Sequence, residues 1–249
     1  WKLGAVPVLI SPMLTGAETN IFLDCANPDL IISNWKVQKK LSDCNFPIFP
    51  IEELSQGFGG CSPFESSNNI DLDRVGLILF TSGTSGKPKK VYLTERNLIE
   101  SARAWGEQLK LNKEDVYLNC MPMFHISGIS IFIRSLIFDF ANYLIDSFDI
   151  ETIDRIFKSG KVTLISMVPT MLKIVLDKMN NSIPSSIRGI IISGGISSEA
   201  LMNRCLYHKI PIYKSYGMTE TSSGICGYWI DKNPSKVSSV GLSFPNMEF

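Results

Sequence analysis

A loop rich in hydroxyl groups, glycines and lysines is the segment of this sequence best equipped for chemistry. It spans Thr81–Lys89, reads Thr-Ser-Gly-Thr-Ser-Gly-Lys-Pro-Lys, and directly follows the apolar stretch Val75–Phe80. Hydroxyls, exposed backbone N–H groups and lysines together provide the donors that a polyphosphate needs. A Gly/Ser-rich surface turn is the alternative, but such turns rarely combine four hydroxyls, two glycines and Lys-Pro-Lys in nine residues. The loop is not a Walker A sequence, because Pro88 and Thr81 stand where that pattern needs Ser or Thr and Gly.

Three further segments carry side chains or turns that could contact a ligand. Met121–Gly128 contains His125, although a single histidine in an apolar stretch is more often a packed core residue. Ser193–Gly195 follows an apolar stretch and, without context, is a tight turn. Tyr216–Thr221 offers a ring that could stack on adenine, a hydroxyl for a phosphate and a carboxylate for Mg²⁺. Its alternative interpretation is a helix N-terminus with Thr and Glu in the first turn.

In their order and spacing, these segments resemble the signature motifs of the adenylate-forming superfamily. This superfamily contains acyl- and aryl-CoA synthetases, luciferases and peptide-synthetase adenylation domains. The resemblance extends from about Val75 to Gly241, where Val240-Gly241 with Pro245 resembles the family's Val-Gly-x-x-x-Pro, and the opening Leu3–Val8 is also similar. It implies that ATP activates a small-molecule carboxylic acid as an acyl-adenylate, with Mg²⁺ as cofactor and CoA as the acyl acceptor.

The resemblance also implies a role for each matched residue. The residues expected to bind the nucleotide are Thr81, Ser82, Gly83, Thr84, Ser85, Gly86, Lys89, Gly194, Gly195, Tyr216, Gly217 and Thr219. The residues expected to meet the acid are His125, Ser193, Gly194, Met218, Thr221 and Gly241. The expected catalytic residues are His125, Thr219, Glu220 and Lys89, and Glu220 is also the expected metal ligand. Lys90 departs from the pattern, since the family usually has Gly there.

Within the superfamily, Cys120–His125 and Tyr216–Ser223 most resemble the o-succinylbenzoate–CoA ligases of menaquinone biosynthesis. The polar run Thr221–Ser223 would suit a dianionic aromatic acid. Other aryl- and fatty-acid–CoA ligases share most of these residues, so they stay open as alternatives, as does a non-catalytic module that binds nucleotide or acid. A P-loop NTPase is disfavoured by Pro88, and a serine hydrolase by the absence of a G-x-S-x-G elbow.

The elements that would position these motifs alternate between strands and helices. Strands expected near residues 145, 164, 191 and 213, with helices in three of the gaps, predict an α/β fold of mostly parallel sheets with flanking helices. Ligands in such sheets lie beyond the carboxyl ends of the strands. We expect a partial first α/β subdomain and linker over residues 1–72, with residues 55–69 as a surface loop, and an ATP- and acid-binding α/β subdomain over residues 73–249.

Composition excludes several other classes. The 24 basic and 24 acidic residues balance, so nothing indicates a nucleic-acid partner. Six scattered cysteines show no zinc spacing and predict free thiols. No apolar run reaches the roughly 18–20 residues of a membrane span, and no signal peptide is evident, so we expect a cytoplasmic protein. The oligomeric state, including a homo-oligomer, stays open. The resemblance implies an incomplete N-terminal domain of the adenylate-forming fold without the C-terminal domain, hence weak nucleotide binding and little complete ligation.

Overall fold

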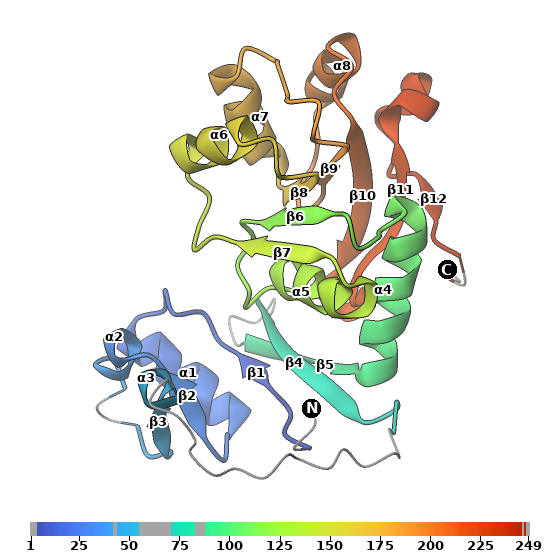
Figure 1. Cartoon of the computed structure of the whole chain (residues 1–249). Coiled ribbons are helices and arrows are strands. Elements are labelled where there is room, and N and C mark those ends of the chain that lie inside the picture. The colour runs from blue at the N-terminus through green and yellow to red at the C-terminus, as the bar shows by residue number, and fades with distance from the viewer. Residues whose placement is uncertain (1–3, 42–43, 55–70, 83–87, 246, 248–249) are drawn as a thin grey trace. The chain divides into compact units, whose positions relative to one another are not determined.

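The structure, a computed structural model, describes residues 4–41, 44–54, 71–82, 88–245 and 247. Its contacts divide the chain into two compact units, residues 1–95 and residues 96–249 (Figure 1). The expected surface loop at residues 55–69 and the expected phosphate-binding residues 83–86 lie outside the described residues. That residues 73–249 form one ATP- and acid-binding subdomain stays a prediction.

Unit 1 contains a three-stranded sheet built around the strand that leads into the Gly-rich loop. In this sheet β1 (Val8–Leu9) pairs in parallel with β4 (Val75–Ser82), and β4 pairs antiparallel with β5 (Pro88–Thr94). Thr81 lies opposite Lys89, so the expected loop joins the two strands of a hairpin. The other elements of this unit are α1 (Gly16–Ala26), β2 (Ile31–Ser33), α2 (Trp35–Gln38), β3 (Ile48–Pro50) and α3 (Ile51–Leu54).

Helix α1 begins at a capping box formed by Thr15 and Glu18, and a lysine from β5 caps its other end. Thr15 Oγ1 accepts a hydrogen bond from the Glu18 N–H at 3.3 Å, and the Glu18 carboxylate accepts one from the Thr15 N–H at 2.8 Å. At the other end, Lys90 Nζ donates to the Cys25 carbonyl at 2.8 Å. Carbonyls in the last turn of a helix lack an intrahelical partner and favour a cation. Lys90, where the family usually has Gly, therefore anchors α1 to the sheet.

Unit 2 is built on a seven-stranded sheet in the order β12-β11-β10-β9-β8-β6-β7. The strands are β6 (Val116–Asn119), β7 (Ala141–Leu144), β8 (Leu164–Met167), β9 (Gly189–Ile192), β10 (Ile212–Met218), β11 (Ser223–Trp229) and β12 (Leu242–Ser243). From β10 to β7 all neighbours are parallel, which confirms the predicted α/β class. The antiparallel edge formed by β11 and β12, and the strand β6, were not predicted.

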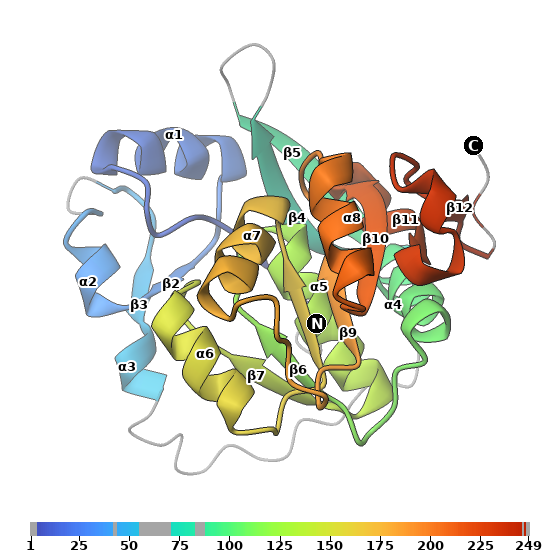
Figure 2. The ribbon, with the colours of Figure 1, turned by 90° about the horizontal axis from the view of Figure 1, so that it is seen from above.

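Helices cover both faces of this sheet (Figure 2). One face carries α4 (Glu95–Leu109) and α5 (Ile126–Phe138), and the other carries α6 (Ile150–Lys158), α7 (Pro169–Lys178) and α8 (Glu199–Tyr207). Side chains alternate along each strand. Tyr117 therefore packs with α4 and α5, whereas its neighbour Leu118 packs with the other three helices. Both side chains are fully buried.

An ion pair between a buried carboxylate and a partly exposed arginine ties the amino ends of the central strands together. Arg188 contacts both carboxylate oxygens of Asp115, at 2.7 and 2.6 Å, and Thr163 Oγ1 donates to the same carboxylate at 2.8 Å. Burial by itself would raise the pKa of Asp115, but the hydrogen bonds from Arg188 and Thr163 outweigh it and hold the pKa below its ordinary value. This cluster lies at the end of the strands opposite to the one where ligands are expected.

Within the described parts of the chain, no helix is long and apolar enough to cross a membrane. The five described cysteines, Cys25, Cys44, Cys120, Cys205 and Cys226, are all free thiols, as predicted. These parts also contain no cluster of three or more His, Cys, Asp or Glu side chains that could hold a metal ion.

Candidate functional site

A cavity of about 220 Å³ lies at the carboxyl ends of strands β8, β9 and β10. Five of the residues predicted to bind nucleotide or acid line it: Ser193, Gly194, Gly217, Met218 and Thr219. The parallel strands bring these residues together, although up to 26 positions separate them in sequence (193 to 219). The cavity is where the fold class places a ligand.

The glycines of the site are required by backbone geometry. Gly194 has φ +73°, a left-handed conformation that a residue with a side chain rarely adopts. Gly217 sits where β10 and β11 approach closely, and a Cβ there would lie 2.0 Å from the Ser223 carbonyl oxygen. At these two positions the wall of the cavity is backbone without a side chain.

The segment Tyr216–Thr221 is part strand and part turn, rather than the helix start that was the alternative. Strand β10 continues to Met218, and Thr219–Thr221 form one 3₁₀ turn. The Tyr216 ring is 45% exposed, which leaves a face on which a flat ligand could stack. Thr221 Oγ1 accepts from the Met218 N–H at 3.0 Å and donates to the Ser223 carbonyl at 2.8 Å. The Thr221 hydroxyl therefore holds the turn, and its contact with the acid stays a prediction.

His125 occupies the N-cap position of α5 and is exposed, with its ring 4.5 Å from that of Phe124. The next two residues, Ile126 and Ser127, line the cavity. Partial burial lowers the pKa of His125 below 6.5, so the imidazole is neutral at pH 7. A neutral histidine at this position could donate or accept a hydrogen bond but would not attract a carboxylate by charge.

Further predicted site residues of unit 2 are not among those that line the cavity. Gly195 and Gly241 are turn residues, Gly241 with φ +95° beside the Gly227 backbone, and Glu220 is exposed on the 3₁₀ turn. Thr81, Ser82 and Lys89 belong to the β4–β5 hairpin of unit 1. Gly83, Thr84, Ser85 and Gly86 are outside the described residues. Their roles toward the nucleotide stay predictions.

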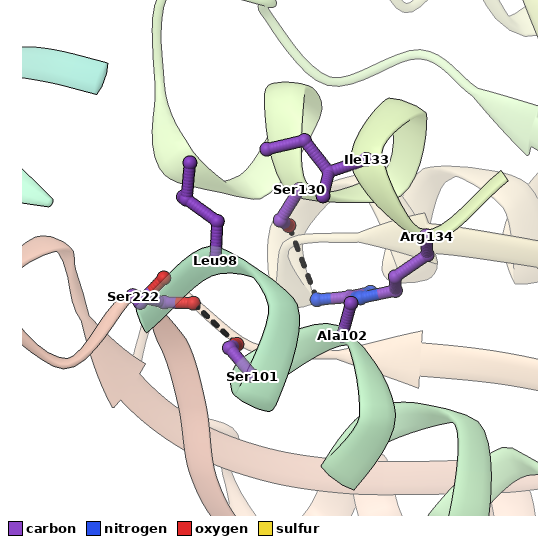
Figure 3. A pocket seen from close by; sticks show the side chains of 7 residues that line it. All are labelled: Leu98, Ser101, Ala102, Ser130, Ile133, Arg134 and Ser222. Atoms are coloured by element: carbon purple, nitrogen blue, oxygen red, sulfur yellow. Dashed lines mark hydrogen bonds between the residues drawn. The ribbon is translucent and has the colours of Figure 1, made fainter. Parts of the chain in front are cut away.

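A buried arginine at the cavity is the residue that motif analysis missed. Arg134, in the middle of α5, is only 2% exposed and lines the cavity. Its Nη2 donates to Ser130 Oγ at 3.1 Å and to Ser223 Oγ at 2.9 Å (Figure 3 shows the first of these). Among the described residues no carboxylate pairs with it. The sequence does contain a feature that could have identified this residue, because Arg134 is the one charged residue in the apolar run Ile126–Phe138.

Desolvation lowers the pKa of Arg134 to about 10, so the guanidinium is still protonated at neutral pH. A buried cation without an anion is expensive to maintain. The hydroxyls of Ser130 and Ser223 hold the group in place but do not neutralise it. The cavity therefore presents an uncompensated positive charge to whatever binds there.

Near Arg134, a hydrogen bond holds the residue that follows the segment Tyr216–Thr221 against α4 (Figure 3). Ser101 Oγ, on α4, donates to the Ser222 carbonyl at 2.6 Å, directly after the 3₁₀ turn. On the sheet side, the Tyr117 hydroxyl and Ser166 Oγ share a hydrogen bond of 2.7 Å, and Ser166 lines the cavity. The polar wall of the site is thus held by groups from two helices and three strands.

Comparison with known proteins decides the family. The AMP-binding enzyme family matches this chain over residues 1–249. The chain belongs to that family. This confirms the membership of the adenylate-forming superfamily that the motifs indicate.

Among relatives of this AMP-binding chain, the 2-succinylbenzoate–CoA ligase of Bacillus cereus (strain Q1) is 33% identical over 242 residues, which is 96% of this chain and 48% of the relative. A double mutant of Bacillus subtilis o-succinylbenzoate CoA synthetase, solved with the product analogue OSB-NCoA, has a TM-score of 0.91 at 30% identity, covering 98% of this chain and 50% of that chain. The structure of o-succinylbenzoate CoA synthetase from Bacillus subtilis in complex with ATP and a magnesium ion has a TM-score of 0.86 at 29% identity, with the same coverage of both chains.

The N-terminal domain of FACL13 from Mycobacterium tuberculosis has a TM-score of 0.87 at 22% identity, over 98% of this chain and 64% of that chain, and shares the fold. The chain spans about half the length of the curated relatives it matches.

Proposed function

We propose that this chain is the acid- and nucleotide-binding part of an o-succinylbenzoate–CoA ligase. In this reaction a carboxylate oxygen of the acid bonds to the α-phosphorus of ATP and pyrophosphate leaves, giving an acyl-adenylate. The CoA thiolate sulfur then bonds to the acyl carbon, and AMP leaves. The relatives with about 30% identity that are named for this activity support the proposal.

The observation that carries the choice of acid is the buried charge of Arg134 in the cavity. One carboxylate of the substrate must reach the α-phosphate, so a monocarboxylic acid would leave Arg134 without an anion. A dicarboxylic acid supplies a second carboxylate, which would neutralise the guanidinium in a site shielded from water. The cavity of about 220 Å³ is also small beside the roughly 300–1,000 Å³ of pockets for larger ligands, which favours a compact aromatic acid over a long-chain fatty acid.

The residues present fit a magnesium nucleotide. The left-handed Gly194 and the glycine Gly217 leave room for close backbone approach, and the exposed Tyr216 ring offers a stacking face for adenine. Glu220, exposed on the 3₁₀ turn, is an oxygen ligand of the kind that Mg²⁺ prefers. Lys89, with the hydroxyls of the β4–β5 hairpin, would hold the terminal phosphates. Magnesium would neutralise phosphate charge as pyrophosphate leaves.

The test is a competition between acids on the 249-residue chain. The chain is incubated with ATP, Mg²⁺ and equal amounts of 2-succinylbenzoate, benzoate and octanoate, and the acyl-adenylates are quantified by mass spectrometry. We expect the 2-succinylbenzoyl adenylate to dominate. A dominant benzoyl or octanoyl adenylate would contradict the proposed acid while leaving the reaction class intact.

Binding of 2-succinylbenzoate measured in parallel distinguishes the alternative function. Tight binding with no adenylate of any acid, in a chain that also binds ATP, would mean a binding module rather than an enzyme. Glu220→Gln is the matched variant, since it should lower adenylate formation and leave the affinity for the acid unchanged.

A further inference from the structure

The end of helix α1 contacts strand β5 on both sides of Lys89. The Cys25 carbonyl accepts a hydrogen bond from Lys90 Nζ at 2.8 Å, and Cys25 Sγ donates a weak one to the Pro88 carbonyl at 3.9 Å. Pro88 and Lys90 are the chain neighbours of Lys89, which is expected to hold the terminal phosphates. The backbone that carries Lys89 is therefore fastened to α1 immediately before and immediately after it.

The pairing of β4 with β5 places the neighbouring lysines on opposite faces of the hairpin. Lys90 lies opposite Phe80, and Lys89 lies opposite Thr81. Because side chains alternate along a strand, Lys90 and Phe80 share one face. Lys89 and Thr81 share the other. The Phe80 ring packs edge-on against Phe22 of α1, with centroids 4.8 Å apart. Helix α1 therefore covers the face of Lys90, and the exposed Lys89 side chain lies on the other face.

Lys90 supplies α1 with a cation that this helix lacks. The last turn of α1 contains no basic residue of its own. Carbonyls in a last turn have no intrahelical partner and favour a positive charge, so the ammonium group stabilises the helix end as it ties the hairpin to it. Lys90 is half-buried, and its Nζ lies 5.8 Å from the centroid of the Tyr92 ring, within the range of a cation–π attraction. Glycine, which the family usually has at this position, could make neither contact.

We propose that Lys90 is a positioning residue for the phosphates of ATP and that it acts through Lys89. The bond from Lys90 to α1 fixes the backbone of β5, and so it holds the Lys89 ammonium and the Thr81 hydroxyl in one place on the opposite face. This inference rests on the proposed function, because it takes the β4–β5 hairpin as the phosphate-binding element. Lys90 itself would not touch the phosphates, because its ammonium group is bound to the end of α1.

The test compares Lys90→Met with Lys40→Met in the 249-residue chain. Lys40 Nζ also donates to backbone carbonyls, those of Pro12 and Leu14 at 2.9 and 3.2 Å, just before the start of α1. Both variants lose one positive charge and one lysine contact to backbone within unit 1, but only Lys90 adjoins Lys89. Isothermal titration measures the affinities for MgATP and for 2-succinylbenzoate at about 50 mM and about 500 mM salt, since high salt screens the effect of a charge alone. Thermal unfolding compares the stabilities.

We expect Lys90→Met to weaken MgATP binding by about 5- to 20-fold at both salt concentrations and to leave the affinity for 2-succinylbenzoate unchanged. Lys40→Met should lower the unfolding midpoint by a similar amount, about 2–4 °C, and should leave MgATP affinity unchanged. A loss of MgATP affinity that disappears at high salt would mean that Lys90 acts by its charge alone. An equal loss in the two variants would mean that Lys90 only stabilises the unit. Either result overturns the positioning role.

The behaviour of wild type separates this inference from the proposed function. If wild type binds MgATP and Lys90→Met binds it equally well, the role of Lys90 is wrong and the proposed function stands. If wild type does not bind MgATP, both are wrong.

Discussion

The guanidinium of Arg134 lies over the indole of Trp105, with Cζ 4.4 Å from the ring centroid. Neither residue belongs to a recognised motif, yet both line the cavity that the motif residues surround. The arrangement is poorly suited to stabilising the fold, because a buried cation facing hydroxyls and a ring is not neutralised. It is well suited to receiving an anion.

Replacing Arg134 with methionine should separate function from stability. Buried charges replaced by well-packed apolar side chains often leave stability unchanged or raise it. We therefore expect Arg134→Met to keep or increase the free energy of unfolding, by about 1 kcal/mol, while 2-succinylbenzoate binding falls at least tenfold. Urea denaturation and isothermal titration measure the two effects. A large loss of stability would show that Arg134 serves the fold instead.

Gly224→Ala should displace Trp105, one of the residues that line the cavity. The new methyl would start 2.4 Å from Trp105 Cζ2, so the indole or strand β11 must shift. Such overpacking typically costs about 1–3 kcal/mol of stability, and we expect a matching loss of affinity for 2-succinylbenzoate. Gly195→Ala is the stability control, because its Cβ would meet Pro169 at an ordinary 3.5 Å. Equal unfolding midpoints for the two variants would contradict this packing argument.

Asp115→Asn should destabilise unit 2 in a pH-dependent way. Replacing the buried carboxylate of Asp115, whose partner Arg188 is partly exposed, should cost about 2 kcal/mol at neutral pH, whereas Asp177→Asn, which removes an exposed carboxylate from Arg204, should cost less than about 1 kcal/mol. The native pKa of Asp115 lies below its ordinary 3.8. Its contribution is therefore complete above pH 3.8 and is lost as the pH falls through the native pKa.

Urea denaturation of both chains from about pH 6 to about pH 3 tests the sign of this effect. The difference in unfolding free energy between wild type and Asp115→Asn should shrink toward acid pH. A difference that is constant or that grows would contradict the account.

Acid binding should respond to the protonation of His125 if that residue meets the substrate. Burial holds its pKa below 6.5, so the ring is neutral at pH 7 and becomes cationic only at lower pH. We expect 2-succinylbenzoate affinity to rise as the pH falls through that pKa, because a cation then faces the carboxylate. His125→Gln should flatten this profile without changing affinity at pH 7 by more than a few-fold. Identical profiles for the two proteins would place His125 away from the acid.

The α/β class and the helices between its parallel strands could be predicted from the sequence because they depend on local signals. Thr15 with Glu18, Pro169 at the start of α7 and Ser198 at the N-cap of α8 act on neighbouring residues and are visible in a single sequence. Strand β6 was missed because Val116–Asn119 is only four residues long and ends on the polar Asn119. The antiparallel edge depends on Gly217 and Gly227, where a Cβ would meet the neighbouring strand, and on Gly224, where a Cβ would meet the Trp105 side chain.

The site itself was predicted only in part. Motifs identified residues at the strand ends, because those residues sit in recognisable runs. Arg134 and Trp105 lie in the middle of ordinary helical patterns, 29 positions apart, and only packing brings the guanidinium over the ring. A single charged residue in an apolar helix pointed to Arg134, whereas nothing in the sequence pointed to Trp105, which packs against it.

The most direct test of the central claim is the ratio of dissociation constants for 3-benzoylpropionate and 2-succinylbenzoate on the 249-residue chain, with Arg134→Met beside wild type. The account predicts that wild type binds the dicarboxylate at least tenfold more tightly and that Arg134→Met abolishes this difference. Equal affinities in wild type, or a preference that survives in Arg134→Met, would contradict the assignment of this cavity to a dicarboxylic acid.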